Sequence, residues 1–233
     1  MRQFPGPAQA VRAGGIGEGQ FGRPVLRGAG FPCRRVLWWW MRVELTPLQA
    51  RLAERLTSRN PRTEDDDALI QAAVAVVFAP DPDAMLFIER AARADDPWSG
   101  HVSFPGGRSH VSDSDLLATA LRETMEEVGV VLHPDQLLGA LDDVAPRRTH
   151  LPPIMVRPFV FALERKPQLV LSEEAAEAIW VPVETLLGPD AYHAQMVGIG
   201  SARRAYPAYR LGPRVVWGMT ERIVTPLLAL LRD

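Results

Sequence analysis

The stretch that most constrains the fold runs over residues 106–130, from a pair of glycines to a single later glycine. Its centre, "RETMEEVG" (122–129), places two glutamates four residues apart and a third glutamate next to the second. Apolar residues recur with the helical period: Leu116, Leu117, Ala120, Leu121, Met125 and Val128. The segment therefore predicts an amphipathic helix that Gly129 ends. Like charges four residues apart repel each other on a helix, so this carboxylate face needs either solvent or a cation.

The three glutamates are the candidate metal ligands. On a helix, Glu123 and Glu127 lie one above the other and Glu126 lies beside them, so all three are predicted to point into one sector. The preceding Gly106 and Gly107 allow the backbone to approach a ligand closely. Carboxylate and carbonyl oxygens are hard donors, which suit Mg²⁺ or Mn²⁺ together with substrate phosphates. From this pattern alone, a solvated glutamate face is the alternative.

The sequence predicts one folded domain that follows an N-terminal extension of unusual composition. Residues 1–41 hold six arginines, a single acid and many glycines and prolines, and we expect them to be a disordered or extraneous extension. Residues 42–68 predict a helix and a linker, with Thr46 as the N-cap and Pro47 at the first helical position. Residues 69–233 hold the remaining predicted elements and form the main domain.

The main domain alternates apolar runs, turn residues and amphipathic segments. Strands are predicted over 69–79 and 84–91, paired as a hairpin, and over 136–144, 153–163 and 168–171. The central helix is capped by Asp113 or Ser114, residues 173–187 predict a short strand and a helical turn, and 214–233 predict a helix kinked at Pro226. Because no regular βαβ rhythm appears, the pattern favours a mixed α/β fold over a doubly wound sheet.

Composition excludes several classes of partner. The 233 residues are 47% apolar and 23% charged, with a net charge of −2, so no excess charge points to nucleic acid. No apolar run near the start is long enough to span a membrane. The lone Cys33 excludes an internal disulfide framework and favours a reducing compartment, hence a cytoplasmic location. The sequence leaves association into a homodimer open.

The segment "GGRSHVSDSDLLATALRETMEEVGV" (106–130) resembles the Nudix box. That box reads Gly, five residues, Glu, seven residues, then Arg-Glu-aliphatic-x-Glu-Glu-x-Gly-aliphatic. Six positions match in register: Arg122, Glu123, Glu126, Glu127, Gly129 and Val130. Three depart: Gly107 lies one residue too far upstream, Asp113 stands where the first Glu belongs, and Thr124 replaces an aliphatic residue. The extra residue lies between Asp113 and Arg122, outside the stretch that carries the metal face.

The resemblance implies a fold, a cofactor and a reaction. The implied fold is an α/β/α sandwich around a mixed sheet, and the implied cofactor is Mg²⁺ or Mn²⁺. Glu123 and Glu127 would be the principal metal ligands, helped by the carbonyl of Gly107, while Glu126 would be a third ligand or the base that activates water. Arg122 would hold the glutamates in place through charge-assisted hydrogen bonds. The implied reaction is hydrolysis of a diphosphate linked to another moiety.

The substrate class is indicated by "GHVSFPGG" (100–107), which follows "LFIERA" (86–91) and resembles the signature of the coenzyme A pyrophosphatase branch. That signature contains two arginines. Arg90 matches the first, but Asp96 occupies the position of the second, and Arg93 is the nearest arginine that could substitute for it. An acid there would repel the 3′-phosphate of coenzyme A. The residues implied for substrate binding are Arg90, Arg93, Gly106 and Phe104.

Three functions fit this resemblance. The first is a diphosphatase acting on coenzyme A or acyl-CoA, giving 3′,5′-ADP and 4′-phosphopantetheine. The second applies the same chemistry to another small nucleoside diphosphate derivative, such as ADP-ribose or a dinucleotide cofactor. The third is a non-catalytic ligand-binding Nudix domain, whose mark would be the loss of a box glutamate from the metal face, and none of Glu123, Glu126 and Glu127 is lost. A complete metal face favours an enzyme.

Three further pairs of residues are candidates for the site. Two glutamates lie after the box, in the segment where several Nudix enzymes keep a mobile glutamate. One of them could be the base in place of Glu126. Two histidines flank the glycine pair, and two arginines follow a predicted strand where they could meet phosphate. These pairs are Glu174 and Glu177, His101 and His110, and Arg147 and Arg148. For each, a solvated surface side chain is the alternative.

Overall fold

The computed structural model describes residues 44–64, 66, 68–93, 99–146, 153–199 and 202–232. All of these belong to one compact unit, 33–233. The expected extension 1–41, Asp96, Arg147 and Arg148 lie outside the described residues, and the expectations for them stay predictions. None of the helices in the described part is long and apolar enough to cross a membrane.

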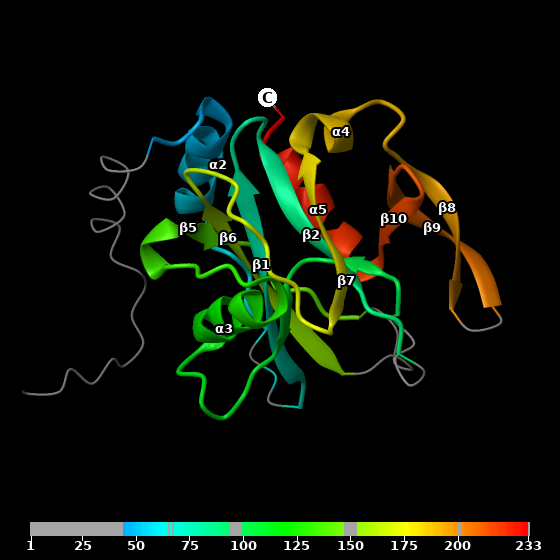
Figure 1. Ribbon diagram of the computed structural model, residues 1–233, viewed down its shortest axis with the longest axis horizontal. Coiled ribbons are helices and arrows are strands. Elements are labelled where there is room, and N and C mark those ends of the chain that lie inside the picture. Colours follow the sequence, from blue (N-terminus) through cyan, green and yellow to red (C-terminus); the bar gives the residue numbers. More distant parts are fainter. Residues whose placement is uncertain are drawn as a thin grey trace, which may run out of the picture. The chain divides into compact units, whose positions relative to one another are not determined.

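A seven-stranded mixed sheet forms the centre of the domain (Figure 1). The middle strand β1 (Ile70–Ala79) pairs in parallel with β6 (Ile154–Ala162), and antiparallel with β2 (Ala84–Arg90) and β4 (Gly106–Arg108). Three strands extend the sheet by antiparallel pairing: β5 (Leu137–Ala140) on β6, and β3 (Val102–Ser103) and β7 (Ala175–Pro182) on β2. The predicted hairpin of β1 and β2 is confirmed. Strand β5 is shorter than the predicted 136–144, because it follows a 3-10 turn at Pro134–Gln136 and ends at Ala140, after which only Val144 makes a single bridge to β6.

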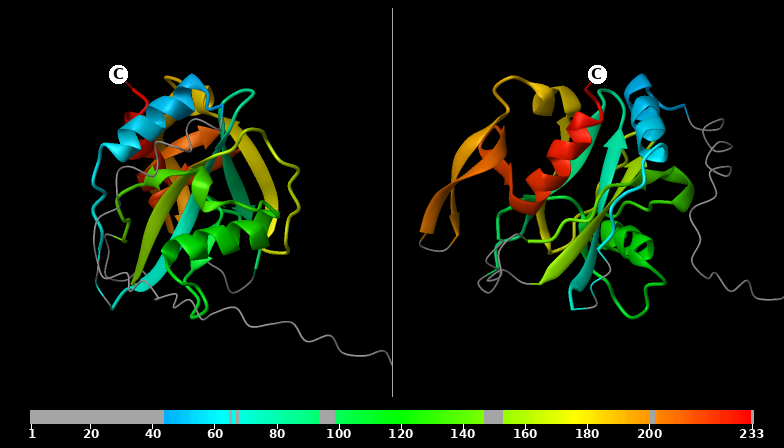
Figure 2. Two further views of the ribbon diagram at one scale, coloured as in Figure 1. Left: turned by 90° about the vertical axis from the view of Figure 1, so that its left-hand side faces the viewer. Right: turned by 180° about the vertical axis from the view of Figure 1, so that it is seen from behind.

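Two hydrophobic cores lie on opposite faces of this sheet, because side chains alternate along a strand. In β1, Val76 and Phe78 pack with helices α2 (Pro47–Thr57) and α5 (Gly218–Ala229). The alternate residues, such as Val77, pack with helix α3 (Leu116–Val128). One helix covers one face and two helices cover the other (Figures 1 and 2). This confirms the predicted α/β/α sandwich around a mixed sheet.

The helix ends follow local side-chain chemistry. Thr46 caps α2 in a capping box with Gln49, and Pro47 takes the first helical position, as predicted. Gly129 ends α3 in the left-handed conformation, with a φ of 70°, also as predicted. The predicted N-cap of α3 was wrong, since Asp115 accepts the hydrogen bond of the Ala118 N–H at 2.8 Å.

The C-terminal part corrects two predictions. Residues 214–217 are a strand, β10 (Arg214–Trp217), and the helix begins only at Gly218, with Pro226 inside it. Strand β10 completes a second sheet with β8 (Tyr192–Ile199) and β9 (Ala202–Leu211), whose hairpin extends away from the larger sheet in Figure 1. Residues 168–171 are not a strand, although the Val170 N–H bonds to the Val128 carbonyl. Strand β7 followed by helix α4 (Val183–Leu187) matches the prediction for 173–187.

One arginine ties the two sheets together. Glu89 of β2 and Glu177 of β7 stand directly opposite each other, and like charges in that position destabilise a sheet. Arg214 of β10 binds both carboxylates, with an Nε–Oε2 distance of 2.7 Å to Glu89. The guanidinium therefore neutralises a repulsive pair and attaches the second sheet to the first.

Replacing this arginine tests that interpretation. Arg214→Leu is expected to lower the melting temperature, because it leaves the two glutamates facing each other without a cation. Adding Glu177→Gln to that variant should restore part of the loss, which thermal unfolding by circular dichroism would detect. If the double variant melts below Arg214→Leu, repulsion between Glu89 and Glu177 is not what Arg214 relieves.

Candidate active site

Glu127 is the most buried acidic side chain at the glutamate face of α3. It is 2% exposed, and its carboxylate accepts the N–H of Gly106 at 2.8 Å. Burial, together with the neighbouring carboxylates of Glu123 and Glu174, raises the pKa of Glu127 to about 7, against the hydrogen bond from Gly106. A buried carboxylate of this kind calls for a proton or a cation.

Glu123 lies one turn before Glu127, and the glycine pair makes room for it. A Cβ atom on Gly107 would stand 2.4 Å from the Oε1 atom of Glu123, so only glycine lets the β4 backbone come this close. Burial also raises the pKa of Glu123, against a hydrogen bond from Arg122. The loop from β3 to α3 and the helix itself thus bring the two carboxylates and the two glycines together.

Arg122 is the centre of a charged network at the start of this face. Its guanidinium binds both carboxylate oxygens of Asp113, at 3.0 and 2.9 Å, and donates to Glu123 at 2.8 Å and to Glu126 at 3.0 Å. Asp113 also accepts the His110 N–H at 2.9 Å, and the bond to Arg122 holds the pKa of Asp113 well below its usual range. Asp113, at the place of the first box glutamate, therefore fixes the arginine that orients Glu123.

A divalent metal fits part of the predicted ligand set. The structure brings together Glu123, Glu127 and Gly107, whereas Glu126, which shares the Arg122 guanidinium with Glu123, is 55% exposed. Within the described ranges, no three acidic, histidine or cysteine side chains converge in a ligand geometry. The donors that do meet are two part-buried carboxylates beside a close backbone, all oxygens, and this chemistry suits a hard divalent cation. The burial of Glu127 argues against a merely solvated face.

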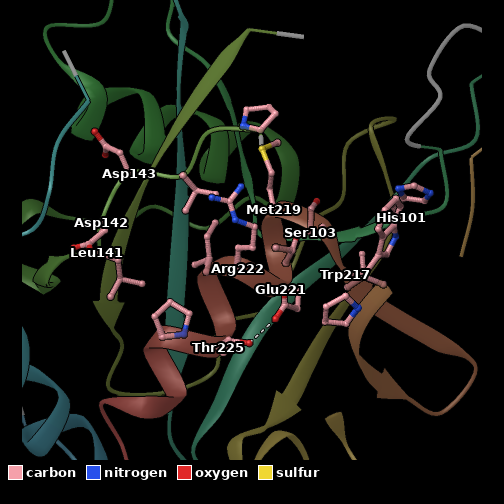
Figure 3. Close-up of a pocket in the computed structure, with 18 of the residues that line it drawn as sticks. His101, Ser103, Leu141, Asp142, Asp143, Trp217, Met219, Glu221, Arg222 and Thr225 are labelled. Atoms are coloured by element: carbon pink, nitrogen blue, oxygen red, sulfur yellow. Dashed lines mark hydrogen bonds between the residues drawn. The ribbon is translucent and has the colours of Figure 1, made fainter. Parts of the chain in front are cut away.

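A cavity of about 920 Å³ has a volume that suits a nucleotide-sized ligand, and it is lined by neighbours of this site but not by Glu123 or Glu127 themselves. Arg90 and Arg108 line it, and the charge of Arg90 lowers the pKa of Glu127. Figure 3 shows other lining side chains, among them those that α5 contributes. Residues lining the cavity include Arg59, Arg62, His101, Asp142, Trp217, Glu221 and Arg222.

Some residues predicted for the site lie elsewhere or have other partners. Phe104 was predicted to bind substrate, but it is 2% exposed and stacks on Phe87 with ring centroids 4.6 Å apart, so its side chain belongs to the core. Gly106 serves through its backbone, as the donor to Glu127. Arg93 donates to Glu174 at 3.2 Å.

The remaining candidates separate in the same way. Glu177 is held by Arg214 at the junction of the two sheets. His110 is exposed and bonds to the hydroxyl of Ser112 at 2.7 Å. His101 lines the cavity, as a contact with the ligand would require.

The sequence analysis missed the α5 side of the cavity. Glu221 and Thr225 are spaced four residues apart, which places them on one face of α5, and Trp217 ends strand β10 just before that helix. That spacing was the available signal. The sequence analysis predicted residues 214–233 as one helix and named no site residue in it.

The fold and the glutamate site define a Nudix protein, and the comparison with protein families agrees. The NUDIX domain family matches residues 69–197, and the chain belongs to this family. Among curated proteins, it is 33% identical over 150 residues to the human mitochondrial coenzyme A diphosphatase NUDT8, covering 64% of this chain and 63% of that protein. The mouse protein of the same name is 30% identical over 187 residues, covering 79% of this chain and 84% of that protein.

Two further matches extend this comparison. An uncharacterized protein of Schizosaccharomyces pombe is 35% identical over 131 residues, 54% of this chain but only 40% of that protein. The chain thus spans less than two thirds of the length of this relative and of the human one. Among solved structures, a MutT/nudix family protein from Enterococcus faecalis superposes with a TM-score of 0.48 at 14% identity, covering 84% of this chain and 73% of that one.

Proposed function

We propose that this Nudix hydrolase is a Mg²⁺- or Mn²⁺-dependent diphosphatase that cleaves coenzyme A or acyl-CoA into 3′,5′-ADP and 4′-phosphopantetheine. The observation that carries the proposal is the pair Glu123 and Glu127 at the glycine backbone, next to a cavity of about 920 Å³ that Arg90 and Arg108 line. The mammalian relatives named as coenzyme A diphosphatases support this substrate class.

The proposed roles follow from the contacts. Glu123, Glu127 and the carbonyl of Gly107 would hold the metal, which when bound would neutralise the diphosphate and lower the pKa of a water molecule. Arg122 keeps Glu123 oriented through its bond to that carboxylate, and Arg90 would meet the substrate phosphates. Catalysis of this kind consists mainly of positioning and electrostatic stabilisation.

Two glutamates are candidates for the residue that accepts the proton from water. Glu126 is exposed but bonded to Arg122. Glu174 is 54% exposed, and its charge raises the pKa of both Glu123 and Glu127, so it lies within electrostatic reach of the site. Of the two, Glu174 fits the role of base better. If Arg93 binds a substrate phosphate in place of the Glu174 carboxylate, that carboxylate becomes free to accept the proton.

A second substrate class has an observation in its favour. Arg93, the nearest substitute for the second arginine of the coenzyme A signature, is bonded to Glu174. A substrate without a 3′-phosphate, such as ADP-ribose or a dinucleotide, would not need this arginine. A non-catalytic binding domain is the weakest proposal, because all three glutamates of the metal face, Glu123, Glu126 and Glu127, are present.

A product assay tests the proposal. The full chain would be incubated with Mg²⁺ or Mn²⁺ and, separately, with coenzyme A, acetyl-CoA, dephospho-coenzyme A, ADP-ribose and NADH, with products identified by mass spectrometry. We expect 3′,5′-ADP and 4′-phosphopantetheine from coenzyme A, lost when a chelator removes the metal. Cleavage of ADP-ribose or NADH alone would move the proposal to the second class. Metal binding without turnover of any substrate would favour the binding domain.

The cellular location is part of the same proposal. The human and mouse relatives are named as mitochondrial proteins. The lone Cys33 suits the reducing environment of the cytoplasm, which is the location we propose. Subcellular fractionation of the source cells, with detection by antibody, would separate the two compartments.

A further inference from the structure

A buried carboxylate lies at the α5 side of the cavity, apart from the glutamates of the box. Glu221 is 7% exposed, and its Oε1 atom accepts the hydroxyls of Tyr192 at 2.9 Å and Thr225 at 2.7 Å. The Thr225 hydroxyl also bonds to that of Tyr209 at 3.0 Å. No lysine or arginine in the described part of the chain forms an ion pair with Glu221. A carboxylate buried with hydroxyl partners alone is costly, which marks it as a residue kept for a ligand.

The second oxygen of this carboxylate accepts no hydrogen bond from the described residues. Both hydroxyls bind Oε1. Oε2 has no hydrogen-bond partner in the described residues and is not fully buried, so it has solvent access. Glu221 is one of the residues that line the cavity, and Figure 3 shows it on α5 beside Thr225. The cavity therefore presents a fixed hydrogen-bond acceptor at this point.

An aromatic surface lies next to the acceptor. Trp217 precedes Glu221 by four residues where β10 passes into α5, and it lines the same cavity. Its ring meets that of Tyr206 at a centroid distance of 5.1 Å and that of His101 edge-on at 5.0 Å. Flat rings of this kind stack on nucleobases of any sequence, so the surface provides affinity and the acceptor provides selection.

We propose that this end of the cavity is a subsite for adenine, whose ring packs on Trp217 and whose exocyclic amino group donates to Glu221. The proposal rests on the proposed function, because coenzyme A, ADP-ribose and NADH all carry adenine. A hypoxanthine base presents a carbonyl oxygen where adenine has its amino group, and the carboxylate repels that oxygen. Sites built to hydrogen-bond one group reject the analogue that lacks it.

Equilibrium binding of AMP and IMP to the full chain, without metal, tests the subsite by calorimetry. The wild-type protein is expected to bind AMP about tenfold more tightly than IMP. Glu221→Gln keeps an oxygen for Tyr192 and Thr225 but turns the free acceptor into a donor, and should bring the two affinities within about twofold. The matched control Glu184→Gln, an exposed glutamate on α4, should keep the preference. Trp217→Leu should weaken both ligands alike, by about tenfold or more.

Several outcomes would overturn the subsite. Equal affinities in the wild-type protein, absence of AMP binding, or an unchanged preference in Glu221→Gln would each do so, and the first two need no variant. Coenzyme A hydrolysis with equal AMP and IMP binding would remove the subsite and leave the proposed function standing. A clear AMP preference without turnover of any diphosphate would do the reverse.

Discussion

Glu127→Gln is expected to slow hydrolysis severely while raising the stability of the metal-free protein. The amide keeps the shape of the carboxylate and an oxygen for the Gly106 N–H, so the fold loses no contact. It removes a buried negative charge beside Glu123, and with it the proposed metal ligand. We expect kcat to fall on the order of 10²- to 10³-fold.

The stability gain depends on pH in a defined direction. The pKa of Glu127 rises from 4.5 to about 7 on folding, so the folded protein binds this proton more tightly than the unfolded chain. Its stabilising effect is complete below pH 4.5 and is lost as the pH rises through about 7. At pH 8 the ionised side chain costs up to about 3 kcal/mol, at about 1.4 kcal/mol for each pH unit of the shift. The variant has no such loss.

Thermal unfolding in chelator, at pH 5 and pH 8, measures this difference. The two proteins should melt at similar temperatures at pH 5, and the variant should melt about 5–10 °C higher at pH 8. Mg²⁺ should raise the melting temperature of the wild-type protein but not that of the variant, because only the former binds it. Glu184→Gln, which changes an exposed glutamate, should alter neither quantity. A pH-independent gap, or retained activity, would contradict the proposed role of Glu127.

The parts of the fold that sequence predicts are those with local signals. The β1–β2 hairpin, α2 with its Thr46 cap and α3 with its Gly129 end all have turn or capping residues next to a clear period. Strand β10 was missed although Gly212 and Pro213 precede it as turn residues, because three apolar residues in a row before Gly218 fit a strand or a helix equally well. Its pairing with β9, which directly precedes it across the turn at Gly212 and Pro213, decides the outcome.

The candidate site, like the fold, was predicted only where the sequence carries a local signal. The spacing of Glu123, Glu126 and Glu127 predicts a shared helix face, but it does not tell which of them turns toward the sheet. Packing buries Glu127 at 2% exposure and leaves Glu126 in solvent with Arg122. The cavity could not be predicted because it is assembled from distant segments, with Arg90 at the end of β2 and Glu221 on α5. Phe104 was misassigned because its packing against Phe87 depends on the same tertiary convergence.

Gly106→Ala and Gly107→Ala are chemically identical changes at adjacent positions, and we expect the first to lower stability and the second to lower activity with little change in stability. A Cβ on Gly106 would stand 2.3 Å from the Ala73 carbonyl oxygen and 2.6 Å from the Val74 Cα, both backbone atoms of the central strand. Gly106 also has a φ of 152°, which an alanine adopts only under strain. Strand β4 would have to leave β1, at a cost of roughly 2–6 kcal/mol from strain and overpacking.

A Cβ on Gly107 meets a different neighbour, the carboxylate of Glu123, at 2.4 Å. That group is the far end of a flexible side chain and can rotate away, so the melting temperature should change little. The rotation displaces a proposed metal ligand, and a misplacement of about 1 Å can reduce the rate on the order of 10²-fold.

Thermal unfolding and kcat, measured on the same preparations of both variants, decide the matter. Gly106→Ala should melt about 10 °C or more below the wild-type protein. Gly107→Ala should melt close to it with most of its activity gone. The glycine pair would then have one member that allows the sheet to form and one that allows Glu123 to reach its position. Comparable losses of stability in both variants would show that the Gly107 backbone, and not the Glu123 carboxylate, is what tolerates no side chain there.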